Sequence, residues 1–403
     1  MTMDLGKETP VPWNDDTKYA LGLYRRYLTL LGIWPLERNR VLPTLRLMFF
    51  ILIQMSLNIT YITNLMTTGY CGRILDLVEI ITILSLSNIS VLKLLVPWRY
   101  SSKMHFVLNS MVEDWAKVYN RRSHDTMMKY AYKGRTVCVL QLFITAFLIL
   151  RNILHKLPAT VAITSGNVTA LSRIVPYGPA CWVSPTMSVH YYNAYYSLIC
   201  IHWLSASLAY IGTDIYLFGL GMHMCGQFEL LAGDLETISG DESVEEQHQK
   251  ISKFIRRHNH LLNVAESIEE VFNIPVLVEV INNTVIISIS GIILLWAYKL
   301  RSRAMAIPKL IRIYLFYVEI FMVSYVGQAL SEQTEKLQEA VYNIPWYKIP
   351  THHMKAIIII MMRVKYPFQL TAGKIADMNY ETYKNVIKST FSYFSVFRLV
   401  LEQ

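Results

Sequence analysis

Long apolar runs separated by charged segments dominate the pattern of this chain. Seven stretches have the length of a membrane span: 41–66, 74–97, 136–154, 186–212, 273–298, 311–330 and 380–401. A helix of about 20 apolar residues crosses the roughly 30 Å hydrocarbon layer of a bilayer. The pattern therefore predicts an all-α, polytopic membrane protein with seven transmembrane helices. The fourth apolar stretch continues to about Gly221, so we expect that helix to project beyond the bilayer.

The last stretch differs from the others, because it is aromatic and apolar on one side and polar on the other. On a helix its polar side chains fall on one stripe: Lys384, Lys388, Ser392, Ser395, Arg398 and Glu402, with Leu399 among them and Val396 at the edge. A Lys near the bilayer centre costs about 2.5–3.5 kcal/mol. The stripe is explained by a water-filled pore between several copies of the chain, or by a buried bundle helix whose serines bond to its neighbours.

Composition agrees with a membrane setting. Of 403 residues, 53% are hydrophobic and 17% are charged. In soluble proteins about a quarter of the residues are charged. The net charge of +9 indicates basic loops beside the membrane and not a nucleic-acid surface. The first forty residues contain no signal-peptide core, so we expect the first span to direct insertion.

The orientation of the chain rests on a single signal. Seven spans place the two termini on opposite sides, and the two sets of loops carry Lys and Arg at nearly equal density. Asn167 heads a glycosylation sequon between spans three and four, which favours an extracellular loop there and a cytoplasmic N-terminus. Asn58, Asn88 and Asn282 head similar sequons inside spans, where no glycan attaches.

No pattern of catalytic or metal-binding residues is present. Cys71 and Cys181 fall in loops on the same side, so a disulfide and two free thiols both remain open, whereas Cys138 and Cys200 lie within spans as packing residues. The chain contains no phosphate-binding loop, nucleophile elbow or HExxH motif. We expect no enzyme activity, no metal and no cofactor.

An ordered set of motifs fills the C-terminal region. It runs from Gly327-Gln328 through YNIPWY at 342–347 and AIIIIMMRVKYPFQLTAGKI at 356–375 to KSTFSYFSVFR at 388–398, and LLGIWPLE stands at 30–37. In these motifs, and over essentially its whole length, the chain resembles the insect odorant receptors. It is similar to their ligand-tuning subunits, because the co-receptor of the family has a larger loop between spans four and five.

The resemblance implies a heterotetramer with the co-receptor that forms an odorant-gated, poorly selective cation channel. It also implies an intracellular N-terminus and a place in the plasma membrane of an olfactory neuron dendrite. We expect a ligand-binding region over 1–330, and an anchor segment with a pore-lining helix over 331–403. Pro345, Trp346 and Tyr347 would then precede a short apolar helix at the subunit interface, although Trp346 equally suits a membrane-interface anchor.

The same resemblance selects residues for the pore and the ligand pocket. The polar stripe selects Ser392, Ser395 and Leu399 for the pore, and comparison with the family's last helix selects Val396 as a hydrophobic gate beside Leu399. The pocket is expected in the outer half of spans two, three, four and six, among Ile80, Ile83, Phe147, Leu150, Tyr191, Tyr192, Tyr195, Tyr314 and Tyr317. Small volatile odorants suit such aromatic walls, although tyrosine is also common at membrane interfaces.

Two carboxylates lie within the predicted spans. Glu79 and Glu319 are functional candidates, because an ionisable group in the bilayer is costly without a purpose. A carboxylate beside the pocket would select amines or bond to a neighbouring hydroxyl, and the sequence leaves both open.

Four other classes of membrane protein were compared with these patterns. A G-protein-coupled receptor would show an Asp-Arg-Tyr-like triplet after span three and a proline in span seven, and neither is present. A transporter would show internal repeats or broken helices, and a membrane enzyme would show converging polar groups. The sequence shows no such repeat and no such groups. A gustatory-type receptor channel is the nearest alternative, but its Gln-Phe ending is missing from the last span.

Overall fold

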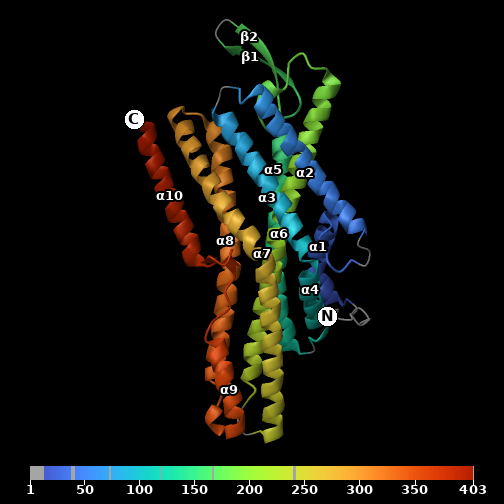
Figure 1. Cartoon of the computed structure of the whole chain (residues 1–403), viewed down its shortest axis with the longest axis vertical. Coiled ribbons are helices and arrows are strands. Elements are labelled where there is room, and N and C mark those ends of the chain that lie inside the picture. Colours follow the sequence, from blue (N-terminus) through green and yellow to red (C-terminus); the bar gives the residue numbers. More distant parts are fainter. Residues whose placement is uncertain are drawn as a thin grey trace.

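The computed structural model describes residues 13–37, 41–71, 74–118, 120–165, 168–238 and 242–402, and within them the chain is a bundle of long helices (Figure 1). The helices are α1 (Asp15–Leu31), α2 (Val41–Thr68), α3 (Ile74–Arg99), α4 (Ser101–Ala116), α5 (Arg121–His155), α6 (Val189–Leu235), α7 (Val244–Lys299), α8 (Arg303–Tyr342), α9 (Thr351–Val364) and α10 (Tyr380–Glu402), with 3-10 turns η1 (Ala180–Trp182) and η2 (Trp346–Lys348). Two short antiparallel pairs, β1 (Thr160–Ser165) with β2 (Val168–Arg173) and β3 (Thr371–Ala372) with β4 (Ala376–Asp377), complete it.

Helices form over all seven predicted spans. Within the described residues, six of them are long and apolar enough to cross a membrane: α2, α3, α5, α6, α7 and α8. The seventh, α10, forms over the expected residues but is not among these six. Its lysines and hydroxyl side chains lower its apolar character, as the sequence indicates.

The molecule is elongated and has two distinct ends. The β1–β2 pair marks one end, here called the hairpin end, and α9 marks the other, the α9 end (Figure 1). Helices α2, α3 and α10 lie in the half nearer the hairpin end, and α6, α7 and α8 continue into the other half. The prediction that the fourth span extends further is confirmed, because α6 has 47 residues.

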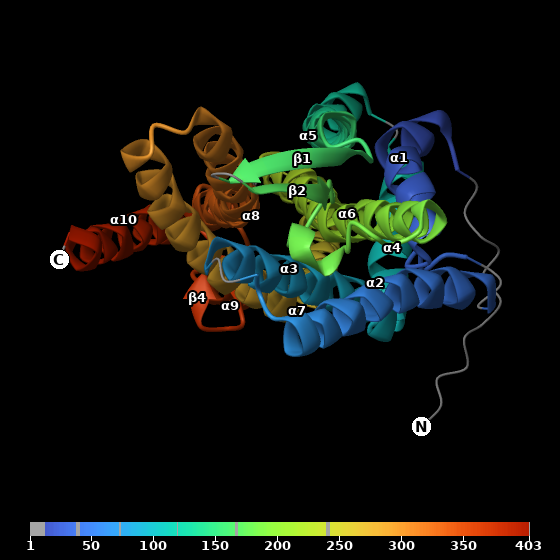
Figure 2. The ribbon, with the colours of Figure 1, turned by 90° about the horizontal axis from the view of Figure 1, so that it is seen from above.

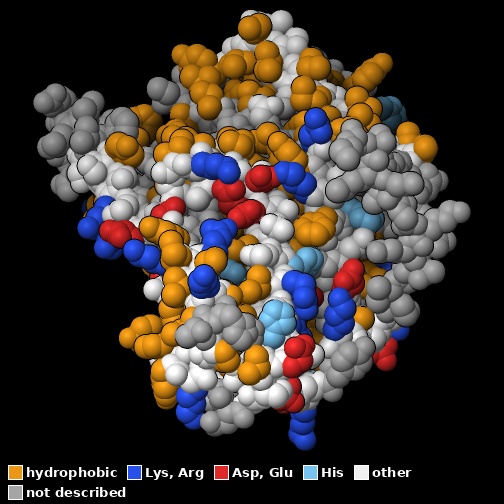
Figure 3. Space-filling view, turned by 60° about the horizontal axis from the view of Figure 1, so that its bottom comes forward, with side chains coloured by type: hydrophobic (Ala, Val, Ile, Leu, Met, Phe, Trp, Pro, Cys, Tyr) orange, Lys and Arg blue, Asp and Glu red, His pale blue; other side chains and the backbone are white. Residues whose placement is uncertain are grey.

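Side chains divide between the two halves. Seen from the α9 side, Lys, Arg, Asp and Glu spread over the near face and hydrophobic side chains gather beyond them (Figure 3). In a membrane protein such a division matches water at one end and lipid around the other.

Helix α6 is the centre of the bundle. It contacts α2, α3, α5, α7 and α8, and its second half from Ala209 to Gln227 is almost entirely buried. Glycine at 219 allows α1 to approach, because a Cβ there would lie 2.6 Å from Cζ of Tyr24. In the view along the long axis, α10 stands at one edge of the bundle, away from α1 and α2 (Figure 2).

The short apolar helix predicted around AIIIIMM is α9. Its Ile357, Ile360 and Val364 are buried, while Ile358 and Ile359 are exposed. The buried face closes a small apolar cavity against the ends of α6, α7 and α8. The helix therefore packs on one side and presents an apolar surface on the other.

The loop between α5 and α6 forms a lid over the helices at the hairpin end. The structure contains a disulfide between Cys71 and Cys181, which joins the end of α2 to η1. Beside it, Trp182 donates a hydrogen bond to the Gly69 carbonyl at 2.9 Å, and its ring lies 5.5 Å from that of Tyr61. The loop between α5 and α6 is thereby fixed to α2.

We expect Cys71→Ser to loosen this lid and to lower the thermal midpoint of the purified chain. A disulfide of this kind contributes about 2–4 kcal/mol, and its closed loop is long, since 110 residues separate the cysteines. Thermal unfolding of Cys71→Ser, Cys181→Ser and the double variant should give equal losses, with Cys200→Ser as the control for a free thiol. Additive losses in the double variant would contradict the disulfide.

Candidate functional site

Side chains from four segments meet near Glu79, below the loop that the Cys71–Cys181 disulfide fixes to α2. Ile80 on α3 is completely buried, and the hydroxyl of Tyr61 on α2 is buried with no hydrogen-bond partner among the described residues. Tyr177, from the loop before α6, packs its ring 4.9 Å from that of Trp203 on α6. This group, here called the outer layer, has the aromatic walls that the sequence predicts for an odorant pocket.

The nine predicted pocket residues differ in burial. Five are buried or half-buried within the bundle: Ile80, Ile83, Tyr192, Tyr195 and Tyr317. A second set of four is more than half exposed on the outside of the helices: Phe147, Leu150, Tyr191 and Tyr314. The structure does not bring this second set to the outer layer. Apolar faces toward lipid and toward a pocket have the same sequence pattern, which is why the sequence did not separate them.

Tyr192 supports the lid. Its hydroxyl donates to the Ile174 carbonyl at 2.7 Å, and its ring packs against Val175 and Val183. Tyr196, one turn later, donates to the Lys156 carbonyl at 2.9 Å. Both tyrosines therefore fix the loop that covers the outer layer.

Helix α8 connects the outer layer to α10. The hydroxyls of Tyr317 on α8 and Thr390 on α10 lie 2.5 Å apart, and Phe321 contacts the rings of Tyr380 and Tyr383 at 6.2 and 5.4 Å. Further along α8, Gly327 lies directly under the Met378 carbonyl, where a Cβ would overlap the oxygen. A displacement of α8 would therefore move the start of α10.

A charged network is buried between the helices. Nζ of Lys93 on α3 lies 2.6 Å from Asp214 on α6 and 2.9 Å from Glu279 on α7, and all three side chains are at least 94% buried. The ring of Tyr210 lies 3.8 Å from the same ammonium group. Three helices thus share one cation. Breaking such a buried pair costs about 3–5 kcal/mol.

Glu319, predicted as a functional carboxylate, belongs to this network. It accepts hydrogen bonds from Tyr210 at 3.2 Å and Asn283 at 3.1 Å. The structure therefore places it against neighbouring polar groups and not in the outer layer. Lys93, Asp214 and Glu279 were not predicted from the sequence, although single charges within apolar runs are a signal for buried partners.

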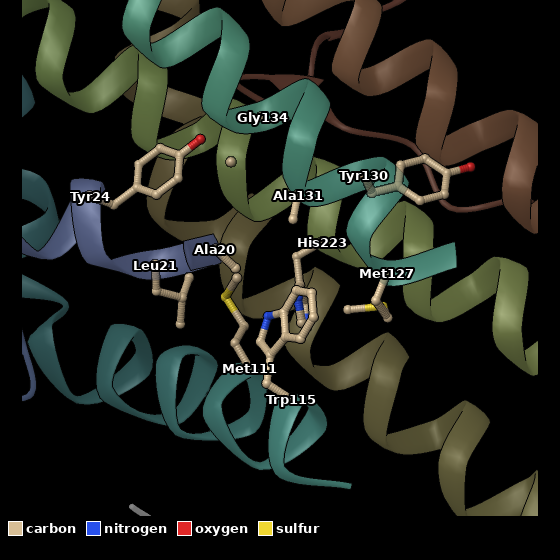
Figure 4. Close-up of a pocket in the computed structure, with 11 residues that line it drawn as sticks. Ala20, Leu21, Tyr24, Met111, Trp115, Met127, Tyr130, Ala131, Gly134 and His223 are labelled. Atoms are coloured by element: carbon tan, nitrogen blue, oxygen red, sulfur yellow. The ribbon is translucent and has the colours of Figure 1, made fainter. Parts of the chain in front are cut away.

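A cavity lies on the α9 side of this network, between α1, α4, α5 and α6 (Figure 4). It is small and is lined by Tyr24, Met111, Trp115, Gly134 and His223 among others. It is separate from the outer layer, because its lining residues come from α1, α4 and the second half of α6.

An ion pair closes the floor of the cavity. Asp114 accepts hydrogen bonds from His223 at 3.1 Å and Arg257 at 2.5 Å. Burial alone would raise the pKa of the Asp114 carboxyl, but the hydrogen bond to His223 and the charge of Arg257 hold it below its usual range. Asp114 therefore stays ionised and ties α4 to α6 and α7.

The remaining predicted residues are those of the pore, the subunit anchor and the glycosylation sequon. Ser392 and Ser395 on α10 are exposed, while the side chains of Val396 and Leu399 and the whole of Asn167 lie outside the described residues. At the α9 end, Pro345 is half-buried, and Trp346 and Tyr347 are exposed with their rings in contact at 6.0 Å. Across the described ranges no three His, Cys, Asp or Glu side chains are placed to hold a metal ion.

Known proteins with similar sequences are odorant receptors. The chain is 22% identical over 232 residues to putative odorant receptor 85d of Drosophila melanogaster, which covers 56% of this chain and 54% of that protein. It is 21% identical over 201 residues to odorant receptor 85b of the same fly, covering 48% and 49%. The matches thus span about half the length of these curated relatives.

Solved structures with the same fold come from an insect. The olfactory receptor OR5 from Machilis hrabei matches with a TM-score of 0.72 and 15% identity, covering 94% of this chain and 99% of that one. The same receptor in complex with eugenol matches with a TM-score of 0.74 and 15% identity, covering 95% and 98%. At this identity the likeness shows the fold, which confirms the predicted all-α polytopic architecture.

A protein-family model gives the assignment. The model described as 7tm Odorant receptor matches residues 73–391, a range that includes the buried network, most of the outer layer and the first half of α10. These matches confirm the resemblance drawn from the C-terminal motifs, and the chain is a multi-pass membrane protein that belongs to the odorant receptor family.

Proposed function

We propose that this chain is a ligand-tuning subunit of an odorant-gated cation channel, in which a small volatile molecule binds in the outer layer. The observation that supports this most directly is the continuous path from Glu79 and Ile80 through α8 to α10, by way of the Tyr317–Thr390 contact. The related OR5 was solved with eugenol, which supports a small aromatic or apolar ligand for the fold.

The proposed orientation places the hairpin end outside the cell and the α9 end in the cytoplasm, in the plasma membrane. The disulfide between Cys71 and Cys181 supports it, because disulfides persist in the oxidising extracellular space. The charged surface toward the α9 end (Figure 3) agrees with a cytoplasmic domain.

In this proposal α10 lines the pore. Its buried side, at Thr390 and the half-buried Tyr383 and Val386, packs on the chain's own α7 and α8. The opposite polar stripe is exposed, including Lys384, Lys388, Ser392 and Ser395. One subunit leaves this stripe uncovered, so several subunits around an axis would enclose it with water. Val396 and Leu399 continue the same helix as the proposed hydrophobic gate.

The α9 end is the proposed anchor between subunits. Trp346, Tyr347, Ile358, Ile359 and Met362 are all exposed there. Apolar and aromatic side chains at a water-exposed end are typical of a protein interface. We assign this surface to contact with the other subunits of a heterotetramer that includes the co-receptor of the family.

The test is electrical. The chain is expressed in cells without olfactory proteins, with and without an insect co-receptor, and a panel of volatiles is applied under voltage clamp. A cation current that requires both subunits is the expected result. Current from the chain alone would contradict the tuning-subunit assignment, and no current with both proteins at the cell surface would contradict the function.

In the same cells we expect Val396→Ala to raise the resting current several-fold, because a smaller ring no longer closes the pore by dewetting. Leu399→Ala is expected to act in the same direction. Ser389→Ala, at an exposed position on the same helix, serves as the control. Unchanged resting current and ion selectivity in both gate variants would remove α10 as the pore helix.

A further inference from the structure

Three cationic side chains surround the single carboxylate of the outer layer. Nζ of Lys309 and a guanidinium nitrogen of Arg312, both on α8, each lie 3.9 Å from the same oxygen of Glu79. Lys156, at the end of α5, lies within electrostatic range of Glu79 and Arg312. Helices α3, α5 and α8 thus bring their charges to one place, beside the walls of the proposed pocket.

These charges are not balanced. A charge-assisted hydrogen bond is normally about 2.7–2.9 Å long, so the two contacts at 3.9 Å are loose ion pairs. Asp76 lies one turn earlier on α3 and has a partner of its own. Even with Asp76 counted, three cations face two carboxylates.

Burial makes the imbalance costly. The side chains of Lys309 and Arg312 are only 15% and 23% exposed, and Lys156 donates to the Pro176 carbonyl at 2.7 Å without meeting a carboxylate. A charge removed from water is stabilised only by a counter-charge or by hydrogen bonds. Within the described residues, neither the guanidinium of Arg312 nor Nζ of Lys309 donates a hydrogen bond.

Apolar and aromatic groups lie next to the cations. Ile80 follows Glu79 directly and is fully buried, and the ring of Tyr177 lies 5.4 Å from Nζ of Lys156. The unpartnered hydroxyl of Tyr61 is within electrostatic range of Glu79 and Tyr177. The outer layer therefore combines an apolar wall, a free hydroxyl and an excess of positive charge.

We propose that the outer layer selects small carboxylic acids in their ionised form. The carboxylate lies between Arg312, Lys309 and Lys156, and the hydrocarbon part lies along Ile80 and Tyr61. Arg312 supplies the planar pair of donors that matches a carboxylate. Glu79 keeps the two α8 cations in position, and the excess of positive charge around it disfavours protonated amines. This inference names the ligand class of the proposed pocket and rests on that proposal.

A structural role for the same cluster predicts a different result. As an ion-pair brace between α3 and α8, it would stabilise the fold and affect every ligand equally. As a ligand site, it must discriminate between ligands that differ only in charge. The discrimination between charged and neutral ligands of equal length is therefore the quantity to measure.

The first experiment measures equilibrium binding to the purified chain in nanodiscs of neutral phosphatidylcholine. The probes are radiolabelled hexanoate, methyl hexanoate, hexan-1-ol and hexylamine. Hexanoate is expected to bind more tightly than the other three. Arg312→Gln and Lys309→Gln should each weaken hexanoate by about tenfold or more, because a hydrogen bond to a charged group is lost, and should change hexan-1-ol by less than about twofold.

Lys299→Gln is the matched control. Lys299 is an exposed cation at the C-terminal end of α7, shortly before α8 begins. It should leave all four affinities unchanged. Equal weakening of every probe by Arg312→Gln would assign the cluster to a structural role, and tighter binding of the ester or the alcohol than of hexanoate by the native chain would overturn the proposal.

Channel recordings with the co-receptor separate this inference from the proposed function. Binding of hexanoate without any current would contradict the channel function and leave the ligand class in place. Currents opened by esters or alcohols, but never by acids, would confirm the channel and contradict the ligand class.

Discussion

Lys93→Met is expected to lower the free energy of unfolding by about 3–5 kcal/mol and to prevent most of the chain from reaching the cell surface. The substitution keeps an unbranched side chain of similar length and removes the ammonium group with its charge and its hydrogen bonds. Asp214 and Glu279 would then face each other without a cation, although both are at least 94% buried. The two carboxylates would lose their counter-charge, and helices α3, α6 and α7 would lose their shared partner.

A surface ion pair provides the control. Lys103 pairs with Glu270, and both side chains are more than 40% exposed, so Lys103→Met should cost at most about 1 kcal/mol. Fluorescence-detected size-exclusion after heating measures both variants. Adding Asp214→Asn and Glu279→Gln to Lys93→Met should recover part of the loss, because the buried charges are then removed together. Equal thermal midpoints for Lys93→Met and Lys103→Met would show that the network contributes little.

Gly327→Ala is expected to leave the helices intact and to suppress most of the ligand-evoked current. A Cβ at this position overlaps the backbone carbonyl of Met378, just before α10 begins. Backbone cannot yield as a flexible side chain can, so α8 and the start of α10 must separate. Overpacking of this kind typically costs about 1–3 kcal/mol, which changes the position of the proposed pore helix.

Voltage clamp and surface labelling together test this variant. Surface labelling should fall modestly while the current per surface receptor falls strongly. Gly22→Ala is the control, because no atom lies within 4 Å of the added Cβ and alanine is the better helix former. Current per receptor equal to that of the native chain in Gly327→Ala would exclude a coupling role for the α8–α10 contact.

The helices of this fold follow from the sequence because their cause is local. Apolar runs of membrane length predicted α2, α3, α5, α6, α7 and α8, and the charge that bounds AIIIIMM predicted a short helix at α9. The extension of α6 was likewise visible as apolar sequence beyond 212.

The contacts between helices do not follow in the same way. Lys93 and Asp214 are 121 residues apart, and nothing in a single sequence pairs them. Phe147 and Leu150 are apolar whether they face lipid or a pocket, so their exposure on α5 could not be foreseen. The cations around Glu79 could not be predicted for the same reason, because they come from the ends of α5 and α8.

The length of α8 has a consequence for how the partners of this chain would act on it. At about 1.5 Å per residue, its 40 residues reach roughly 60 Å, and one end carries Lys309 and Arg312 beside the outer layer while the other packs on α9. A subunit that bound the α9 end would therefore contact the same helix as the proposed ligand. Thermodynamic reciprocity then requires that a change of partner alters ligand affinity by the factor with which the ligand alters the affinity for that partner. Sensitivity to an odorant is in this sense a property of the assembly, and the same chain paired with two different co-receptors would have two dose–response curves.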